Sequence, residues 1–371
     1  MTTNGSPNLA ADEVINVNGL KIYYPTDEGV VKAVDGVDFT IKPGETLGVV
    51  GESGCGKSTV GRAILNILDK PGKIEDGEIT WRLPDDRVID ITKLDANSRM
   101  MRSIRGAGIA LVFQEPMTSF SPLHTVGNQV AEALRLHTDL SEQGIVDRSI
   151  ELLQMVGIPN AEQRLKEYAF QLSGGLRQRA MIAMALSCEP RLLIADEPTT
   201  ALDVTTQAQI LELLKELQIK LGMGMILITH NLGIVRHMAD RVVVMTSGEI
   251  VEHAATGDLF HSPQHPYTIH LLNSEPGGIP AGQDFEAKTV LTTKNLRVWF
   301  PIKSGIFRRT VDYVRAVDEV SLEVREGQTV GVVGESGSGK TTLGLALLRL
   351  ISSEGAVDFQ GIPINTSSNK T

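Results

Sequence analysis

Short apolar runs alternate with segments of helical periodicity along most of the chain. Continuous apolar runs, which are typical of strands buried on both faces, lie at 46–50, 108–114, 192–195, 225–229 and 242–245. Segments that predict helices lie at 59–68, 126–136, 146–156, 175–188 and 205–221. Because strands alternate with helices, the pattern predicts an α/β fold with a mostly parallel sheet and helices on its faces.

Two regions depart from this alternation. Near the N-terminus, residues 14–24 alternate apolar and polar positions as a half-buried strand does, and 31–41 and 76–81 predict further strands of an antiparallel β subdomain. From 116 to about 171 the pattern is helical throughout, which predicts a helical insertion within the α/β core. Residues 1–13 are polar and predict a disordered tail.

A glycine-rich segment follows the first apolar run and precedes the first helix. It matches the pattern G-x-x-x-x-G-K-[ST]. Backbone amides of such a loop close around phosphate oxygens at the positive end of the helix, the lysine reaches the β- and γ-phosphates, and the hydroxyl binds Mg²⁺. The predicted nucleotide-binding residues here are Gly51, Glu52, Ser53, Gly54, Cys55, Gly56, Lys57, Ser58 and Thr59, with Ser58 also a metal ligand.

The same loop occurs a second time, with Gly334, Glu335, Ser336, Gly337, Ser338, Gly339, Lys340 and Thr341. The upstream sequence repeats too, since 32–37 matches 315–320 and 43–50 matches 326–333. This repeat predicts a duplicated domain. We expect a first domain at 14–252, an appendage at 253–273, a linker rich in Pro, Gly and polar residues at 274–288, and an incomplete second domain at 289–371.

Composition narrows the class of protein. A hydrophobic content of 42% and a charged content of 22% are ordinary for a globular protein, and the net charge of −10 argues against nucleic acid as a main partner. The 2 cysteines have no paired spacing, which predicts a reducing compartment and no zinc site. No apolar run approaches about eighteen residues, so membrane association would need a partner.

Two further motifs carry chemistry. Asp196 and Glu197 end an apolar run, where Asp196 can hold Mg²⁺ through water and Glu197 can polarise the water that attacks the γ-phosphate; the alternative is a strand that ends in solvated acids. Ser173, Gly174 and Gly175 open a helix and can bind an anion with their amides; the alternative is a simple helix cap.

Together these motifs resemble the nucleotide-binding domain of ABC ATPases, a branch of the P-loop NTPases. The resemblance implies that 172–178 is the family signature, with Leu176 departing from the usual Gln or Glu, and that 201–203 is the D-loop. It assigns Gln114 to the loop that senses Mg²⁺ and the transport partner, and His230 to the switch histidine at the γ-phosphate. Tyr24 is a candidate for stacking on adenine, although a core aromatic explains it nearly as well.

The segments 113–117, 195–203 and 265–268 look like those of ATPase subunits of bacterial oligopeptide and dipeptide importers. The duplicated layout, with the segments 272–276 and 299–302, resembles the fused ATPase of microcin C and oligopeptide importers. This resemblance implies ATP and Mg²⁺ as cofactors, integral-membrane permease subunits and a periplasmic or extracellular peptide-binding protein as partners, and the cytoplasmic face of the inner membrane as location. Since family members sandwich ATP between two domains, a homodimer or second ABC domain is needed. With an incomplete second copy we expect slow hydrolysis; the alternatives are a soluble non-transport ABC ATPase or a remnant that binds ATP with little turnover.

Overall fold

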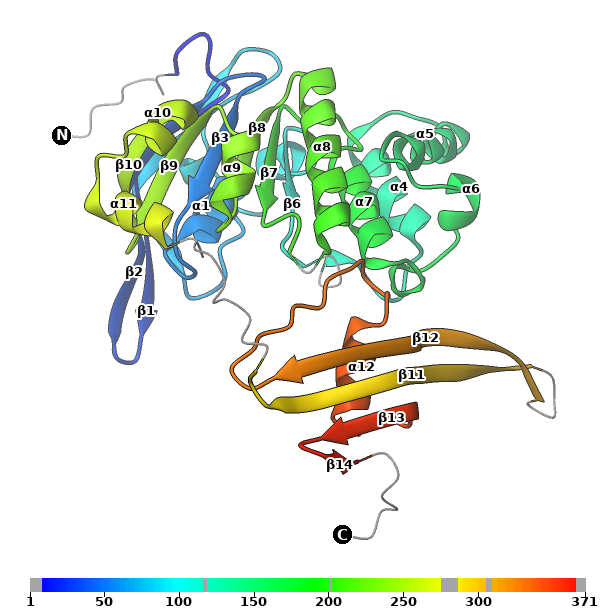
Figure 1. Ribbon diagram of the computed structural model, residues 1–371. Coiled ribbons are helices and arrows are strands. Elements are labelled where there is room, and N and C mark those ends of the chain that lie inside the picture. The colour runs from blue at the N-terminus through cyan, green and yellow to red at the C-terminus, as the bar shows by residue number, and fades with distance from the viewer. Residues whose placement is uncertain (1–8, 116–118, 201, 275–285, 305–308, 365–371) are drawn as a thin grey trace. The chain divides into compact units, whose positions relative to one another are not determined.

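The computed structural model describes residues 9–115, 119–200, 202–274, 286–304 and 309–364. Two compact units make up this part of the chain (Figure 1). The first comprises the described residues up to Leu202 and from Gln207 to Ser274, and the second comprises Asp203–Thr206 and the described residues from Glu286 onward. Among the described residues, the first unit contains two sheets and the second contains one, and each unit has its own core.

The first unit is built on a six-stranded sheet with the order β10-β9-β3-β8-β7-β6. The neighbouring strands from β9 to β6 are parallel, and β10 is antiparallel to β9. This arrangement confirms the predicted α/β fold. The strands are β3 (Thr46–Val50), β6 (Ile109–Val112), β7 (Leu192–Asp196), β8 (Gly224–Ile228), β9 (Arg241–Thr246) and β10 (Glu249–Ala255).

Helices cover both faces of this sheet (Figure 1), so every position of its central strands β3, β7 and β8 is buried, and all but Thr46 and Asp196 are apolar or glycine. Along β7, Leu193 packs into a core shared with the helical insertion, whereas Leu192 and Ile194 pack into the core on the opposite face. The helices that follow the central strands are α1 (Lys57–Ile64), α8 (Val204–Leu221) and α9 (Leu232–Met238), and α7 (Gly174–Ala185) precedes β7.

An antiparallel sheet with the order β2-β1-β4-β5 confirms the predicted β subdomain. Its strands are β1 (Ile15–Thr26), β2 (Gly29–Ile41), β4 (Lys73–Arg82) and β5 (Val88–Asp90), followed by η1 (Ile91–Lys93) and α2 (Arg99–Ile104). Of the predicted disordered tail, residues 1–8 lie outside the described residues. Leu9 and Ala10 are ordered by contacts, because Leu9 is buried and the Arg82 guanidinium donates to the carbonyls of both residues.

The helical insertion contains α4 (Val126–His137), α5 (Glu142–Met155), α6 (Ala161–Arg164) and η2 (Ala169–Gln171). Side chains at the starts of the two long helices satisfy free amides, since Thr125 accepts from the Asn128 amide and Ser141 from the Gly144 amide. Residues 116–118, where the insertion was predicted to begin, lie outside the described residues.

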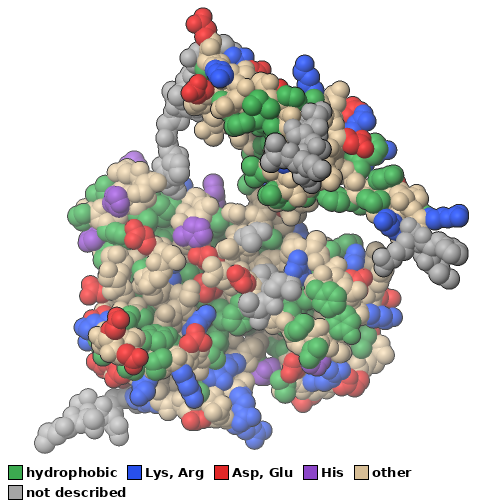
Figure 2. Space-filling model, turned by 90° about the horizontal axis from the view of Figure 1, so that it is seen from below, with side chains coloured by type: hydrophobic (Ala, Val, Ile, Leu, Met, Phe, Trp, Pro, Cys, Tyr) green, Lys and Arg blue, Asp and Glu red, His purple; other side chains and the backbone are tan. Residues whose placement is uncertain are grey.

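The appendage of the first unit consists of α10 (Thr256–His261) and α11 (Pro266–Asn273), which lie beside β9 and β10 (Figure 1). The predicted boundary at 252 was wrong by a few residues, because β10 continues to Ala255 and carries His253 into the sheet. Histidines gather at this corner (Figure 2), but no group of three or more His, Cys, Asp or Glu among the described residues could hold a metal ion. Most of the predicted linker lies outside the described residues.

The second unit is an antiparallel sheet with the order β12-β11-β13-β14 and one helix. Its elements are β11 (Thr289–Ser304), β12 (Arg309–Arg325), α12 (Lys340–Leu347), β13 (Glu354–Phe359) and β14 (Ile362–Pro363). Its core is small and centres on Leu296, Val298, Val317, Leu343 and Val357. No described helix in either unit is both long and apolar enough to cross a membrane.

Candidate nucleotide-binding site

The carboxyl ends of four neighbouring parallel strands bring the predicted site residues together. The phosphate loop follows β3, His230 lies just beyond β8, Glu197 directly follows β7, and Gln114 follows β6. Because β3, β8, β7 and β6 are adjacent in that order, residues far apart in sequence meet at one edge of the sheet. Ligands of open α/β sheets bind at this edge.

The first phosphate loop needs glycine at two positions where the chain passes close to other backbone. Gly51 has φ +149° and Gly56 has φ +104°. A Cβ at Gly51 would overlap the Met245 carbonyl oxygen, and one at Gly56 would overlap the Ala33 carbonyl oxygen. The glycines of the motif therefore close the loop against β9 and β2, at the N-terminus of α1.

Lys57 is buried and folds back over the loop. Its Nζ donates to the carbonyl oxygens of Gly51 at 2.8 Å and Glu52 at 2.7 Å. The next residue connects the loop to the acid pair, because Ser58 Oγ donates to Asp196 Oδ1 at 2.9 Å. Burial raises the pKa of the Asp196 carboxyl, and the hydrogen bond from Ser58 opposes that rise only in part. A buried carboxylate beside a hydroxyl gains from a cation, as the magnesium prediction requires.

Glu197 is held by three side chains from three different segments. Its Oε2 accepts from Gln114 Nε2 at 2.8 Å and from Thr200 Oγ1 at 2.9 Å, and its Oε1 lies 3.0 Å from His230 Nδ1. Since an ionised carboxylate only accepts, Nδ1 of His230 carries the proton. The backbone of Glu197 has φ +45°, a region that non-glycine residues rarely occupy, and its amide donates to the Ile228 carbonyl.

These contacts set the charge of Glu197. Burial raises its pKa, but the hydrogen bonds from His230 and Thr200 and the nearby charge of Lys57 lower it by more, so the pKa lies below the ordinary value for glutamate. Glu197 is therefore ionised at neutral pH. An ionised, oriented carboxylate can accept a proton from a water molecule.

Sequence reasoning missed Thr200. It lies three residues after Glu197, the spacing at which a side chain on a turn can reach back, and Thr hydroxyls commonly make such local bonds. The spacing of Thr200 from Glu197 is visible in the sequence, but a threonine hydroxyl at that spacing has many other possible hydrogen-bond partners.

The signature residues form the start of a helix away from this network. Ser173 is the N-cap of α7, and its Oγ accepts from the Leu176 amide at 3.4 Å, with Gly174 and Gly175 in the first turn. No described hydrogen bond joins these three residues to the phosphate loop or the acid pair. Their role in anion binding stays a prediction.

The structure does not decide between the two interpretations of Tyr24, adenine stacking and a core aromatic. It packs beside the core of the antiparallel sheet, and a Cβ on Gly72 would touch it, yet the side chain is only partly buried. Stacking on adenine stays a prediction. The neighbouring Tyr23 is engaged elsewhere, since its hydroxyl donates to Asp35 at 2.7 Å.

The second phosphate loop has the backbone of the first. Gly334 and Gly339 have φ +150° and +92°, and a Cβ at Gly339 would overlap the Ala316 carbonyl oxygen. Lys340 Nζ donates to the carbonyl oxygens of Gly334 and Glu335. A pocket of about 400 Å³ beside it is lined by Lys340 and by Arg315 and Val317 of β12.

The residues of the first loop fit a magnesium nucleotide. The cradle is closed by glycines that no other residue could replace without overlap, and Lys57 supplies a positive charge. Ser58 and Asp196 together offer a hydroxyl and a carboxylate, the oxygen ligands that Mg²⁺ prefers alongside phosphate oxygens.

Comparison with known proteins decides the family. The family model described as "ABC transporter" matches residues 34–200 and 317–371, which is more than half of the chain. The chain belongs to the ABC transporter family. The resemblance that the motifs predicted is thereby confirmed.

Curated relatives of this ABC protein are ATP-binding proteins of transport systems. It is 50% identical over 362 residues to the "Peptidoglycan transport ATP-binding protein YejF" of Agrobacterium fabrum, covering 96% of this chain and 64% of the relative. It is 44% identical over 391 residues to the "Glutathione import ATP-binding protein GsiA" of Escherichia coli K12, covering 98% and 62%. The chain thus spans somewhat less than two thirds of these relatives.

Among solved structures, this ABC protein is similar to the dimeric post-hydrolysis state of the ATP-binding cassette MJ0796 bound to ADP and Pi. The TM-score is 0.57 and the sequence identity 29%, over 65% of this chain and 98% of the cassette. The likeness supports the ABC ATPase fold.

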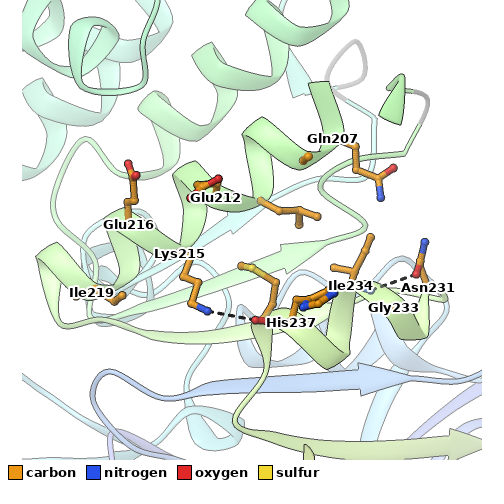
Figure 3. Close-up of a pocket in the computed structure, with 12 residues that line it drawn as sticks. Gln207, Glu212, Lys215, Glu216, Ile219, Asn231, Gly233, Ile234 and His237 are labelled. Carbon is orange, nitrogen blue, oxygen red and sulfur yellow. Dashed lines mark hydrogen bonds between the residues drawn. The ribbon is translucent and has the colours of Figure 1, made fainter. Parts of the chain in front are cut away.

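A separate cavity of about 770 Å³ lies between α8 and α9 (Figure 3). Lys215 of α8 bridges it by donating to the His237 carbonyl of α9 at 3.2 Å, and Glu212 and Glu216 line the α8 side. None of the predicted site residues lines this cavity, so it is not the nucleotide site.

Proposed function

We propose that the first unit binds ATP with Mg²⁺ and hydrolyses it. The observation that carries this proposal is the position of Glu197, which Gln114, Thr200 and His230 hold beside the phosphate loop while Ser58 contacts its neighbour Asp196. A loop for phosphate and an oriented base therefore share one edge of the sheet.

Each residue has a distinct task in this proposal. The loop from Gly51 to Thr59 binds the phosphates through the Nζ of Lys57 and through its amides, except the Glu52 amide, which donates to the Tyr267 hydroxyl. Ser58, Asp196 and Gln114 would hold Mg²⁺ directly or through water. The metal neutralises charge that develops on the phosphate oxygens.

Glu197 accepts the proton of the attacking water, and His230 fixes the carboxylate by donating from Nδ1. Thr200 and Gln114 orient the second oxygen of Glu197. Tyr24 stacks on the adenine, and Ser173, Gly174 and Gly175 offer amides to the nucleotide of a partner domain.

The proposed role in the cell is the ATP-binding subunit of a peptide importer. The transport functions printed in the names of the two relatives support it. In this proposal the protein lies at the cytoplasmic face of the bacterial inner membrane, attached to integral-membrane permease subunits that receive peptide from a periplasmic or extracellular binding protein. A second ABC unit, in this chain or in another copy, completes the nucleotide sandwich. The helical insertion after Gln114 offers the permease a surface.

The catalytic part of the proposal is tested with Glu197→Gln. We expect ATP hydrolysis to fall by about 10²- to 10⁴-fold, as expected for the loss of a general base, while Mg·ATP still binds. Glu216→Gln is the matched control, since Glu216 is exposed on α8 and should leave the rate unchanged. Equal hydrolysis by Glu197→Gln and the wild type would contradict the proposal.

The transport part is tested by purification from bacterial membranes. We expect the tagged chain to co-purify with integral-membrane permease subunits. Recovery with ribosomes instead would overturn the importer assignment and favour a non-transport ABC ATPase.

A further inference from the structure

The appendage of the first unit makes a direct hydrogen bond to the phosphate loop. The amide of Glu52, the second residue of the loop, donates to the hydroxyl oxygen of Tyr267 in α11 at 3.1 Å. The carbonyl of the same Glu52 accepts from Lys57 Nζ. Glu52 is thus held through its amide by the appendage and through its carbonyl by the loop lysine.

Tyr267 is held in place by the start of its own helix. The Glu252 carboxylate on β10 accepts from the amides of Gln264 at 2.8 Å and His265 at 2.9 Å, which fixes the chain just before α11. His265 then caps the helix, with its Nδ1 accepting from the Tyr267 amide at 3.2 Å. A ladder of hydrogen bonds therefore runs from β10 through the helix cap to the phosphate loop.

Apolar packing links the same two segments. Val50, the residue before Gly51, shares a core cluster with Val244 of β9 and Leu259 of α10, and the ring of Tyr267 and Leu271 of α11 pack against that cluster. The appendage consequently supports the loop at its beginning, both through a hydrogen bond and through packing.

We propose that Tyr267 is a positioning residue of the nucleotide site, which sets ATP affinity by fixing the Glu52 peptide at the start of the phosphate loop. This inference rests on the proposed function of the first unit. The hydrogen bond from the Glu52 amide to the Tyr267 hydroxyl keeps the loop in the closed conformation that receives phosphate. Without the hydroxyl, the loop becomes ordered only when nucleotide binds, and the free-energy cost of this ordering weakens the binding. Glu197 is untouched, so the rate of the chemical step is unaffected.

The test compares Tyr267→Phe with the wild-type chain. The substitution removes one hydroxyl and keeps the ring in its cluster. Loss of one hydrogen bond predicts a Kd for Mg·ATP that is about threefold to tenfold weaker, and a KM raised by the same factor with kcat unchanged. Tyr313→Phe is the matched control, because this exposed ring of β12 has no hydrogen bond from its hydroxyl among the described contacts.

A second variant approaches the contact from its other end. Glu252→Gln keeps the size of the side chain but offers one accepting oxygen instead of two to the amides of Gln264 and His265. We expect a smaller weakening of Mg·ATP binding than in Tyr267→Phe.

Amide hydrogen exchange in the nucleotide-free chain gives an independent readout. Exchange at Glu52 should be faster in Tyr267→Phe than in the wild type. A purely structural loss in α11 would instead leave exchange at Glu52 unchanged and raise it in the helix alone.

The outcomes separate the two proposals. Wild-type binding of Mg·ATP with an unchanged Kd in Tyr267→Phe would overturn the role of Tyr267 and leave the ATPase assignment intact. A wild-type chain that does not bind Mg·ATP would overturn the proposed function and this inference with it. A weaker Kd in Tyr267→Phe accompanied by an equal loss in Tyr313→Phe would also contradict the inference.

Discussion

The two phosphate loops have nearly the same sequence and the same backbone, but they come after very different segments. In both, the lysine donates to the carbonyls of the first two loop residues, and the last glycine lies against a carbonyl of the preceding hairpin. The first loop comes directly after β3, a strand in which every residue is buried. The second comes after Thr329–Val333, which differs from β3 only by Val330 in place of Leu47 and yet forms no strand.

This difference separates local from non-local structure. The loop conformation depends on glycines, on one lysine and on the helix after them, all within a few residues, so it forms in both places. A parallel strand needs partners from elsewhere in the chain: β3 pairs with β8 and β9, whose residues come much later in the sequence. Val49 is 2% exposed in that sheet, whereas its counterpart Val332 is 51% exposed.

The chemistry divides in the same way. Ser58 of the first loop contacts Asp196, and Glu197 lies beside it, because β7 is two strands away in the same sheet. No described residue hydrogen-bonds to the side chain of Thr341, the counterpart of Ser58. In the proposed function, the motif binds phosphate in either place, whereas the base for hydrolysis is available only where the residue lies at the end of a strand of the parallel sheet.

The largest difference between the two loops is expected in the rate of ATP hydrolysis when the lysine of each is replaced. Lys57→Ala should lower ATP hydrolysis by about 10²- to 10³-fold, as expected for loss of a charged donor to the developing charge. Lys340→Ala, at the matching position, should change the hydrolysis rate by less than about threefold, since Glu197 belongs to the first site. Steady-state phosphate release measures both. Equal losses would show that hydrolysis depends on the two loops alike.

The next prediction compares the same Val→Ala substitution at a buried position, Val49, and at its exposed counterpart, Val332. Val49→Ala should lower the free energy of unfolding of the first unit by about 2 kcal/mol, because it removes two buried carbons from a central strand. Val332→Ala should cost less than about 0.5 kcal/mol. Denaturant unfolding followed by circular dichroism gives both values. A large cost for Val332→Ala would indicate that the repeated segment forms a buried strand in solution.

The smallest effect concerns the hydrogen bond from Thr200 to Glu197. Thr200→Val keeps the shape of the side chain and removes one of the three donors to Glu197, and kcat should fall by about threefold to tenfold, the net worth of roughly one ordinary hydrogen bond. The Kd for Mg·ATP should stay the same. Thr206→Val, on α8, removes a hydroxyl bonded to Asp203 and serves as the comparison. A change in Kd with unchanged kcat would place Thr200 in nucleotide binding instead.

Much of the site could be predicted from sequence because its residues lie directly after buried strands. The apolar runs at 46–50, 192–195 and 225–229 predicted strands, and the residues after neighbouring parallel strands meet at one edge of the sheet. The positions of Glu197 and His230 result from that rule. The role of Tyr267 could not be predicted, since its contact with Glu52 joins residues 215 positions apart through a helix packed on the sheet edge.

The boundaries were harder to predict than the elements for similar reasons. Residues 9–13 were predicted to belong to the disordered tail, yet the Arg82 guanidinium donates to the carbonyls of Leu9 and Ala10, a contact that no local pattern encodes. Likewise β10 extends past the expected boundary because its pairing with β9 continues to Ala255.

A crystal structure of Glu197→Gln with Mg·ATP would test the central claim most directly. The account predicts the γ-phosphate in the cradle from Gly51 to Ser58, the metal between Ser58 and Asp196, and the side chain at 197 facing the γ-phosphate. A γ-phosphate bound away from that cradle, or a residue 197 turned away from it with Gln114 and His230 elsewhere, would contradict the account.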